Sequence, residues 1–146
     1  MQSSIVSAKT SEMSLSLANS ILESAIEKAG QLGVSVNIAV VDASSFLKAF
    51  ARIDGANLGS IDIALKKART ALLFGIPSGE IGKLSQPGGP LFSIEHSNGG
   101  LITFTGGTPV KSPNGIIIGA IGVSGSTVEN DLTISLAGAA NEACAS

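Results

Sequence analysis

The sequence predicts one α+β domain, in which a mostly antiparallel sheet is flanked by helices. Two long stretches, residues 12–32 and 60–74, carry apolar residues at helical spacing. The strand-like segments follow one another across short turns, which indicates hairpins rather than strands that alternate with helices. The predicted order is α-β-β-α-β-β-β-α, with five strands. We expect a single domain over residues 1–146, whose residues 1–10 form a polar, mobile lead-in.

The first part of the chain predicts a helix and then a hairpin. The helix covers residues 12–32 and ends at Gly33. Its core-facing stripe consists of Ala18, Leu22, Ala25, Ala29 and Leu32. Residues 34–40 alternate between large apolar and smaller side chains, and residues 46–53 form a second strand after a turn.

A second helix is predicted over residues 60–74, with Ser60 as its N-cap and Gly75 at its end. Its apolar stripe consists of Ile61, Leu65, Ala68 and Leu72. Residues 78–84 suit a short extra helix. The next segment, residues 85–90, contains two prolines and two glycines and must be a loop.

Three further strands are predicted, at residues 91–95, 100–104 and 115–123. The first two would be joined by a hairpin turn at residues 96–99, in which Asn98-Gly99 is the strongest signal. The segment between residues 106 and 115 contains two prolines and three glycines and is predicted to be irregular.

The rest of the chain is organised around residues 115–140, a buried strand that leads through a tight turn into a helix. Ser126 and Glu129 have the spacing of a capping box. The N–H groups at this helix start are a candidate anion site; the alternative is a plain capped connection, because Glu129 and Asp131 already place negative charge there. The predicted apolar face of the helix consists of Leu132, Leu136, Ala139, Ala140 and Ala143.

The composition excludes several classes of function. The net charge is -2, there is no basic run, and Tyr and Trp are absent, so a nucleic-acid surface is not expected. The single cysteine, Cys144, permits neither an internal disulfide nor a cysteine metal site. Only 14% of residues are charged, which predicts that self-association covers part of the surface. No apolar leader or long apolar run is present, so we expect a cytoplasmic protein without membrane contact.

Four segments in this order resemble the GlcG/HbpS-like family, which also includes the C-terminal domain of PduO-type proteins. The segments are VVDASSFLKAFARIDGA (40–56), SIDIALKKARTA (60–71), FTGGTPV (104–110) and GAIGVSGSTVENDLTISLAGA (119–139). The resemblance implies a profilin-like fold with a five-stranded sheet, and homodimers that assemble into rings or octamers. It also implies heme as a cofactor and, for some members, heme degradation.

Lys67 and His96 are the leading candidates for chemistry. Lys67 shares a helical arc with apolar residues, so it would pair with a carboxylate, hold an anionic ligand or form a Schiff base; the alternative is a stem on apolar surface with its amine in water. His96 is the only histidine. It would act as an iron ligand or an acid/base; the alternative is a solvated turn residue. A lone histidine excludes a two-histidine zinc site.

The other candidates are polar groups at turns and helix starts. Arg52 and Asp54 would form an ion pair or a plain turn, and Glu129 would serve as an acid/base or only as a helix-start charge. The loop that contains Gly107 and Thr108 is poor in side chains, so it would let a flat ligand, or a second subunit, lie against the backbone. Such a ligand would be held by Arg52, Lys67, Gly107, Thr108, Ser126 and Thr127.

Three functions remain open at this point. The first is an oligomer that binds heme or a similar flat anionic molecule, with its carboxylates on Lys67, Arg52 or the Ser126–Thr127 helix start. The iron would take His96 or Thr108. The second is a cofactor-free isomerase, cyclase or lyase that uses Lys67, His96, Asp54 and Glu129. The third is an accessory or assembly protein without a small ligand.

Overall fold

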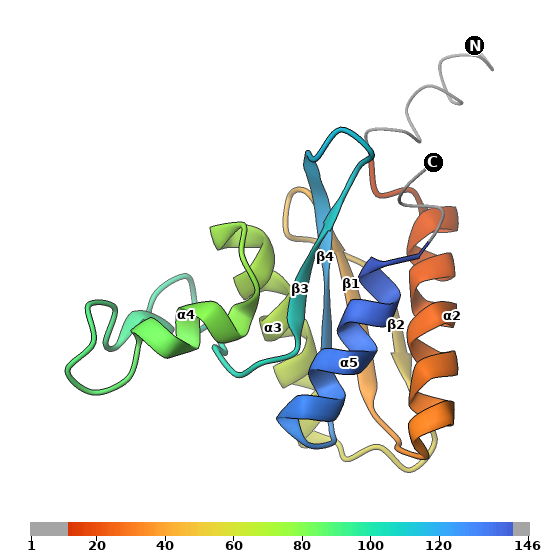
Figure 1. The fold of residues 1–146 in the computed structure, drawn as a ribbon, viewed down its shortest axis with the longest axis horizontal. Coiled ribbons are helices and arrows are strands. Elements are labelled where there is room, and N and C mark those ends of the chain that lie inside the picture. Colours follow the sequence, from red (N-terminus) through yellow and green to blue (C-terminus); the bar gives the residue numbers. More distant parts are fainter. Residues whose placement is uncertain (1–11, 142–146) are drawn as a thin grey trace.

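The computed structural model describes residues 12–141, so the predicted lead-in, Ala143 of the predicted last helix and Cys144 lie outside the described residues. One antiparallel sheet of four strands has the order β2-β1-β4-β3 (Figure 1). The elements in chain order are α2 (Leu15–Leu32), β1 (Asn37–Asp42), β2 (Leu47–Arg52), α3 (Gly59–Phe74), α4 (Ser78–Leu84), η1 (Ile94–His96), β3 (Gly107–Lys111), β4 (Ile117–Ser124) and α5 (Val128–Ala139). In this part of the chain, no helix is long and apolar enough to cross a membrane.

The sheet lies between two helical layers. The helices α2 and α5 cover one face and α3 covers the other (Figure 1). Strand alternation divides the core accordingly: Ile38 and Val40 of β1 face α2, whereas Ala39 and Val41 face α3. The predicted α+β class with an antiparallel sheet and flanking helices is therefore confirmed.

The predicted count of five strands is wrong. Residues 91–95 and 100–104 form turns, the one-turn helix η1 and irregular chain, so no hairpin turn joins them at residues 96–99. The predicted irregular segment contains the edge strand β3 instead. Pro109 is tolerated there because an edge strand pairs on one side only.

The side of α3 that faces the sheet was also predicted wrongly. Of the predicted stripe only Ala68 is fully buried, and it shares the buried face with Ala64, Lys67 and Ala71. The reason is a close approach between α3 and β4. A Cβ at Gly122 would lie 2.0 Å from the carbonyl oxygen of Ala64, so only small side chains fit between them. The larger residues Ile61, Leu65 and Leu72 are left half-buried.

The helix ends agree with the sequence better than the helix starts. Gly33 and Gly75 cap α2 and α3 in left-handed conformations, with φ of 71° and 69°. Leu58, not Ser60, is the N-cap of α3, and Asn57 Oδ1 accepts from the Ser60 N–H.

At α5 the predicted capping box and apolar face are both wrong. The N-cap is Thr127, whose hydroxyl accepts from the Asn130 N–H. The buried residues of α5 are Asp131, Ile134, Ser135 and Gly138, whereas Leu136 is exposed. The inward face of α5 therefore carries an acid, Asp131, which pairs with Lys67 of α3.

Candidate functional site

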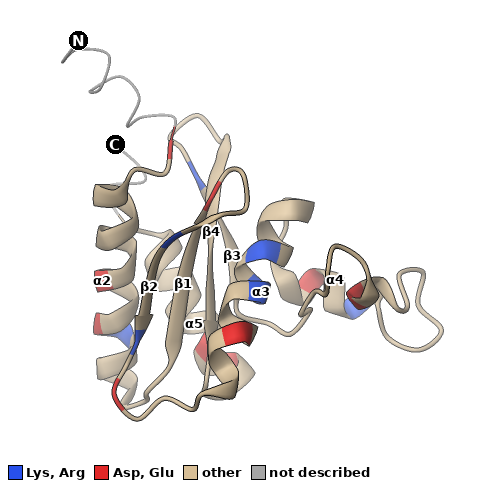
Figure 2. Cartoon of the chain, turned by 180° about the vertical axis from the view of Figure 1, so that it is seen from behind, with Lys and Arg blue, Asp and Glu red and all other residues tan. Residues whose placement is uncertain are grey.

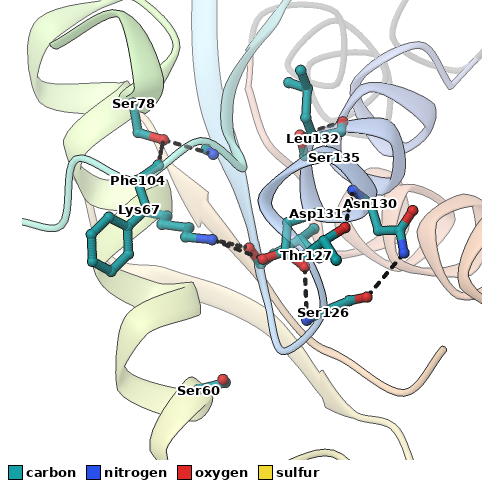
Figure 3. Close-up of polar contacts among 12 residues, drawn as sticks. Ser60, Lys67, Ser78, Phe104, Ser126, Thr127, Asn130, Asp131, Leu132 and Ser135 are labelled. Atoms are coloured by element: carbon teal, nitrogen blue, oxygen red, sulfur yellow. Dashed lines mark hydrogen bonds and ion pairs between the residues drawn. The ribbon is translucent and has the colours of Figure 1, made fainter. Parts of the chain in front are cut away.

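Lys67 of α3 and Asp131 of α5 form a buried ion pair (Figure 3). Lys67 Nζ lies 3.0 Å from Asp131 Oδ2 and donates to the Val123 carbonyl at 2.8 Å. Asp131 Oδ1 accepts from the Ser126 N–H at 3.1 Å. The two side chains are only 1% and 3% exposed. The pair therefore joins α3, the end of β4 and the start of α5 through buried polar contacts.

Two glycines make room for this pair. A Cβ at Gly106 would lie 2.9 Å from Lys67 Nζ, and a Cβ at Gly107 would lie 2.2 Å from the Lys67 carbonyl oxygen. Gly106 also has φ of 131°, which L-residues rarely adopt. Gly106, just before β3, and Gly107, its first residue, thus let the backbone pass close to the lysine, and the predicted ligand-contacting residue Gly107 takes part in this packing.

Burial dominates the electrostatics of the pair. It lowers the pKa of the Lys67 ammonium and raises the pKa of the Asp131 carboxyl, because each charge loses its hydration. The opposite charge acts against both shifts. The prediction that Lys67 pairs with a carboxylate is confirmed, and the alternative of an amine that reaches water is wrong.

Two hydroxyl contacts extend this polar centre. Ser78 Oγ donates to the Phe104 carbonyl at 2.6 Å and accepts from the Gly107 N–H at 2.8 Å (Figure 3). The hydroxyl of Thr108 lies 2.8 Å from that of Ser135 on α5, and Thr108 is buried. The Thr108 side chain therefore points into the protein, toward α5.

The remaining predicted site residues lie at the surface and on different elements. Arg52 ends β2, Asp54 follows it, and Glu129 and Thr127 stand at the start of α5. Within residues 12–141 the ion pairs join Lys66 to Asp62, Lys67 to Asp131 and Lys83 to Glu80, so Arg52 and Asp54 are not paired. Ser126 is partly buried and its hydroxyl accepts from the Asn130 amide.

His96 is exposed at the end of η1, as the solvated alternative expects. The turn that follows it lies against α3: Asn98 O accepts from Arg69 Nη2 at 3.5 Å, and a Cβ at Gly100 would lie 3.5 Å from Lys66 Nζ. No cluster of three potential metal ligands occurs in the described residues. The structure therefore does not bring Lys67, His96, Asp54 and Glu129 together as one catalytic set.

An apolar groove between β2 and α3 was not foreseen. We call this surface the groove; it has a volume of about 550 Å³ and is lined by Leu47, Phe50, Leu58, Ile61, Asp62 and Leu65. It exists because α3 packs mainly on β1, β3 and β4 and leaves part of β2 uncovered. Its one charge, Asp62, is paired with Lys66 at 3.0 Å, which places an ammonium group at the rim.

The phenylalanines of this chain lie at its surface rather than in its core. All five phenylalanines lie outside the buried core: Phe46, Phe74, Phe92 and Phe104 are exposed and Phe50 is half-buried in the groove. Aromatic side chains at a surface are typical of recognition sites. The sequence signal for the groove was the pair Ile61 and Leu65, but the predicted apolar stripe of α3 placed both residues in the core.

Comparison with known proteins adds to this geometry. A family model described as haem degrading protein HbpS-like matches residues 13–140. The chain belongs to the HbpS-like family. This result confirms the resemblance that the four sequence segments carried.

The relatives of this HbpS-like chain include longer proteins. It is 37% identical over 115 residues to corrinoid adenosyltransferase PduO of Salmonella typhimurium, which covers 78% of this chain but only 34% of PduO. It is 38% identical over 120 residues to an uncharacterized 15.0 kDa protein from the dhaT-dhaS intergenic region of Citrobacter freundii, which covers 82% and 84% of the two chains. The crystal structure of a PduOC:heme complex matches with a TM-score of 0.84 and 34% identity, and covers 89% and 94% of the two chains.

Proposed function

We propose that this chain binds heme, with the porphyrin ring in the groove between β2 and α3. The observation that carries the proposal is the similarity to the PduOC:heme complex, at 34% identity and over 89% of this chain. The description of the family, which names haem, supports the same ligand.

The groove has the chemistry that a heme requires. Five of its six lining residues are apolar, which suits the porphyrin face, and its volume of about 550 Å³ is that of a small-molecule site. Lys66 at the rim would pair with a propionate, and Arg69 lies one turn further along α3. Lys67, which the sequence suggested for this role, is buried in its own ion pair.

His96 is the candidate iron ligand. It is the only histidine of the chain, and the turn after it contacts Arg69 and approaches Lys66 beside the groove. The hydroxyl of Thr108, the other candidate, faces Ser135 in the interior. When bound, the heme iron supplies a Lewis-acidic, redox-active centre; the residues named here would hold and orient it.

A hemin titration tests the proposal. We expect a saturable Soret shift in the wild type, weaker binding in Leu58→Asp, and an altered Soret position in His96→Ala. Leu136→Asp is the matched control, because Leu136 is a leucine 49% exposed on α5, on the other face of the sheet. Absence of saturable binding in the wild type removes the function. Unchanged binding in Leu58→Asp would show that the groove is not the heme site. An unchanged spectrum in His96→Ala would show that His96 is not the iron ligand.

Oxidative breakdown of bound heme is a second candidate, favoured by the description of the family as haem degrading. Incubation of the heme-loaded protein with oxygen and a reductant tests it. The readout is the rate at which the Soret band is lost, which should be faster with the wild type than with hemin mixed with Leu58→Asp. The small-substrate enzyme has no comparable support, because its four residues lie apart.

A further inference from the structure

Arg52 carries an unpaired guanidinium at the end of β2. The cationic residues of this strand are Lys48 and Arg52, drawn blue in Figure 2. Arg52 is exposed, and its side chain forms no hydrogen bond or ion pair with the other residues that the structure describes. A free guanidinium is a strong binding group for carboxylates, because its planar N–H groups can donate to both carboxylate oxygens at once.

The register of β2 places this guanidinium on the groove side of the sheet. Phe50 and Arg52 are two residues apart in a regular part of the strand, so their side chains leave the same face. Phe50 lines the groove and packs against the cluster of small residues under α3. Arg52 therefore stands one side-chain position beyond Phe50, at the end of the groove.

A β-bulge aligns the rest of the strand with this face. The pairing of β1 with β2 shifts between Val40 and Val41, which leaves Lys48 as an extra residue on β2. In a regular strand Leu47 and Phe50 would point to opposite faces, but the bulge turns both toward the groove, which they line. The strand thus presents an apolar stretch to a ligand and a cation at the end of that stretch.

The groove end beside Arg52 contains a buried amide with a free oxygen. Asn37 lies opposite Arg52 in the pairing of β1 with β2 and is fully buried. Its Nδ2 donates at 3.0 Å to the carbonyl of Asn57, the residue before Leu58 of the groove lining. Its Oδ1 has no hydrogen-bond partner within residues 12–141. A guanidinium has enough N–H groups to donate to this oxygen and to a carboxylate together.

The cations of α3 beside the groove are already engaged. Lys66 Nζ lies 3.0 Å from Asp62 Oδ2, so a ligand carboxylate must compete with that acid. Arg69 donates through Nε to Ser45 Oγ at 3.2 Å and through Nη2 to the Asn98 carbonyl at 3.5 Å. The guanidinium on β2 has no such partner among the described residues, so it binds a carboxylate without first losing a contact.

We propose that Arg52 is the principal binding group for the carboxylates of the groove ligand, with its guanidinium oriented by Asn37 Oδ1. The inference rests on the proposed function, because it names the residue that selects a flat apolar ligand with carboxylates over one without them. For heme, it places the propionate edge at the end of β2 and the ring over the apolar lining. Lys66 contributes less, because Asp62 offsets its charge.

Two ligands and three variants test this assignment. Hemin carries two free propionates, whereas hemin dimethyl ester carries none. Arg52→Gln removes the charge, and Arg52→Lys keeps the charge but loses the paired N–H geometry. Lys48→Gln is the matched control, because Lys48 is an exposed cation on the same strand and is not part of the groove lining. Absorbance titration gives each Kd, and circular dichroism establishes that each variant is folded.

We expect Arg52→Gln to bind hemin about tenfold less tightly than the wild type, the scale of one charge-assisted hydrogen-bonded pair. It should bind the ester as tightly as the wild type does. Arg52→Lys should be intermediate with hemin, and Lys48→Gln should match the wild type with both ligands. Added salt should weaken hemin binding more in the wild type than in Arg52→Gln, because the lost interaction is between charges.

Equal losses of hemin and ester affinity in Arg52→Gln overturn the inference, because they show that the arginine acts through packing rather than through the carboxylates. Unchanged hemin affinity in Arg52→Gln, or an equal loss in Lys48→Gln, overturns it as well. In these cases the proposed function stands, because the wild type still binds hemin. Absence of saturable hemin binding in the wild type overturns both.

Discussion

The Lys67–Asp131 pair allows a quantitative test of how the core is held. Lys67→Met keeps most of the side-chain volume but leaves the Asp131 carboxylate with the Ser126 N–H at 3.1 Å. Asp131→Asn keeps the shape but leaves a buried ammonium with the Val123 carbonyl at 2.8 Å. We expect each change to cost about 3–5 kcal/mol of unfolding free energy, the usual result of removing one partner of a buried pair.

The double variant Lys67→Met/Asp131→Asn should cost clearly less than the sum of the two. Both charges are then absent, so no uncompensated ion remains in the interior, and the coupling should exceed about 1 kcal/mol. Urea unfolding followed by circular dichroism gives these values; for a chain of this size each kcal/mol corresponds to about 2–4 °C in Tm. Lys66→Met is the control: its partner Asp62 is largely exposed, so we expect a change within about 0.5 kcal/mol.

The pH dependence of Lys67→Met follows from the sign of the Asp131 shift. Burial raises the pKa of this carboxyl, and removal of the lysine charge that opposes the shift raises it further. The native state then binds a proton more readily than the unfolded state, so stability falls as pH rises through this window. The deficit of Lys67→Met should therefore shrink on acidification toward pH 4. Single variants that lose less than about 1 kcal/mol, or strictly additive costs, would refute a buried, coupled pair.

Three further predictions concern the packing of α3 on β4, the segment between α3 and β3, and the groove. Gly122→Ala should destabilise the protein strongly in urea unfolding, because the new Cβ would lie 2.0 Å from Ala64 O; Gly30→Ala, with nothing within 4 Å of the new Cβ, should not, and equal effects would contradict the close approach. Glu95 accepts from the hydroxyls of Ser85 and Thr103, so Glu95→Gln should raise amide hydrogen exchange in residues 76–106, between α3 and β3, at neutral pH. The wild type should show the same change only as pH falls through the lowered pKa of Glu95, and identical exchange in both proteins would contradict its bridging role. Saturating hemin should raise the urea midpoint of the wild type but not that of Leu58→Asp, whose new charge lies in the groove; an equal rise in both would show that heme does not occupy the groove.

The sequence predicted best those elements whose large apolar residues face the core. In α2, Ala18, Leu22, Ala25 and Ala29 are buried as their spacing indicates, although Leu32 at the end of the predicted stripe is exposed. The strands β1 and β4 form the central strands. The prediction failed where long-range contacts, rather than the local apolar pattern, determine the structure. Residues 91–95 have the alternation of a strand, but they lie in the segment between α4 and β3 and have no sheet partner. The strand β3 was hidden by Pro109 and by Gly106 and Gly107.

The same contrast explains why the sequence indicated Lys67 but not its partner Asp131, and why it did not indicate the groove. The position of Lys67 on the helix indicated a buried lysine, but its partner required knowledge that α5 turns Asp131 inward. Close backbone packing of α3 on Gly122 selects alanines for the interior and leaves Ile61 and Leu65 outside. A protein that uses its smallest residues where helix meets strand retains its larger apolar side chains for the surface. All five phenylalanines lie outside the core and only 14% of the residues are charged, so this surface is rich in apolar side chains. The heme proposed for the groove would cover Ile61 and Leu65, which is why the residues that sequence patterning assigns to the interior are the ones that the proposed function needs at the surface.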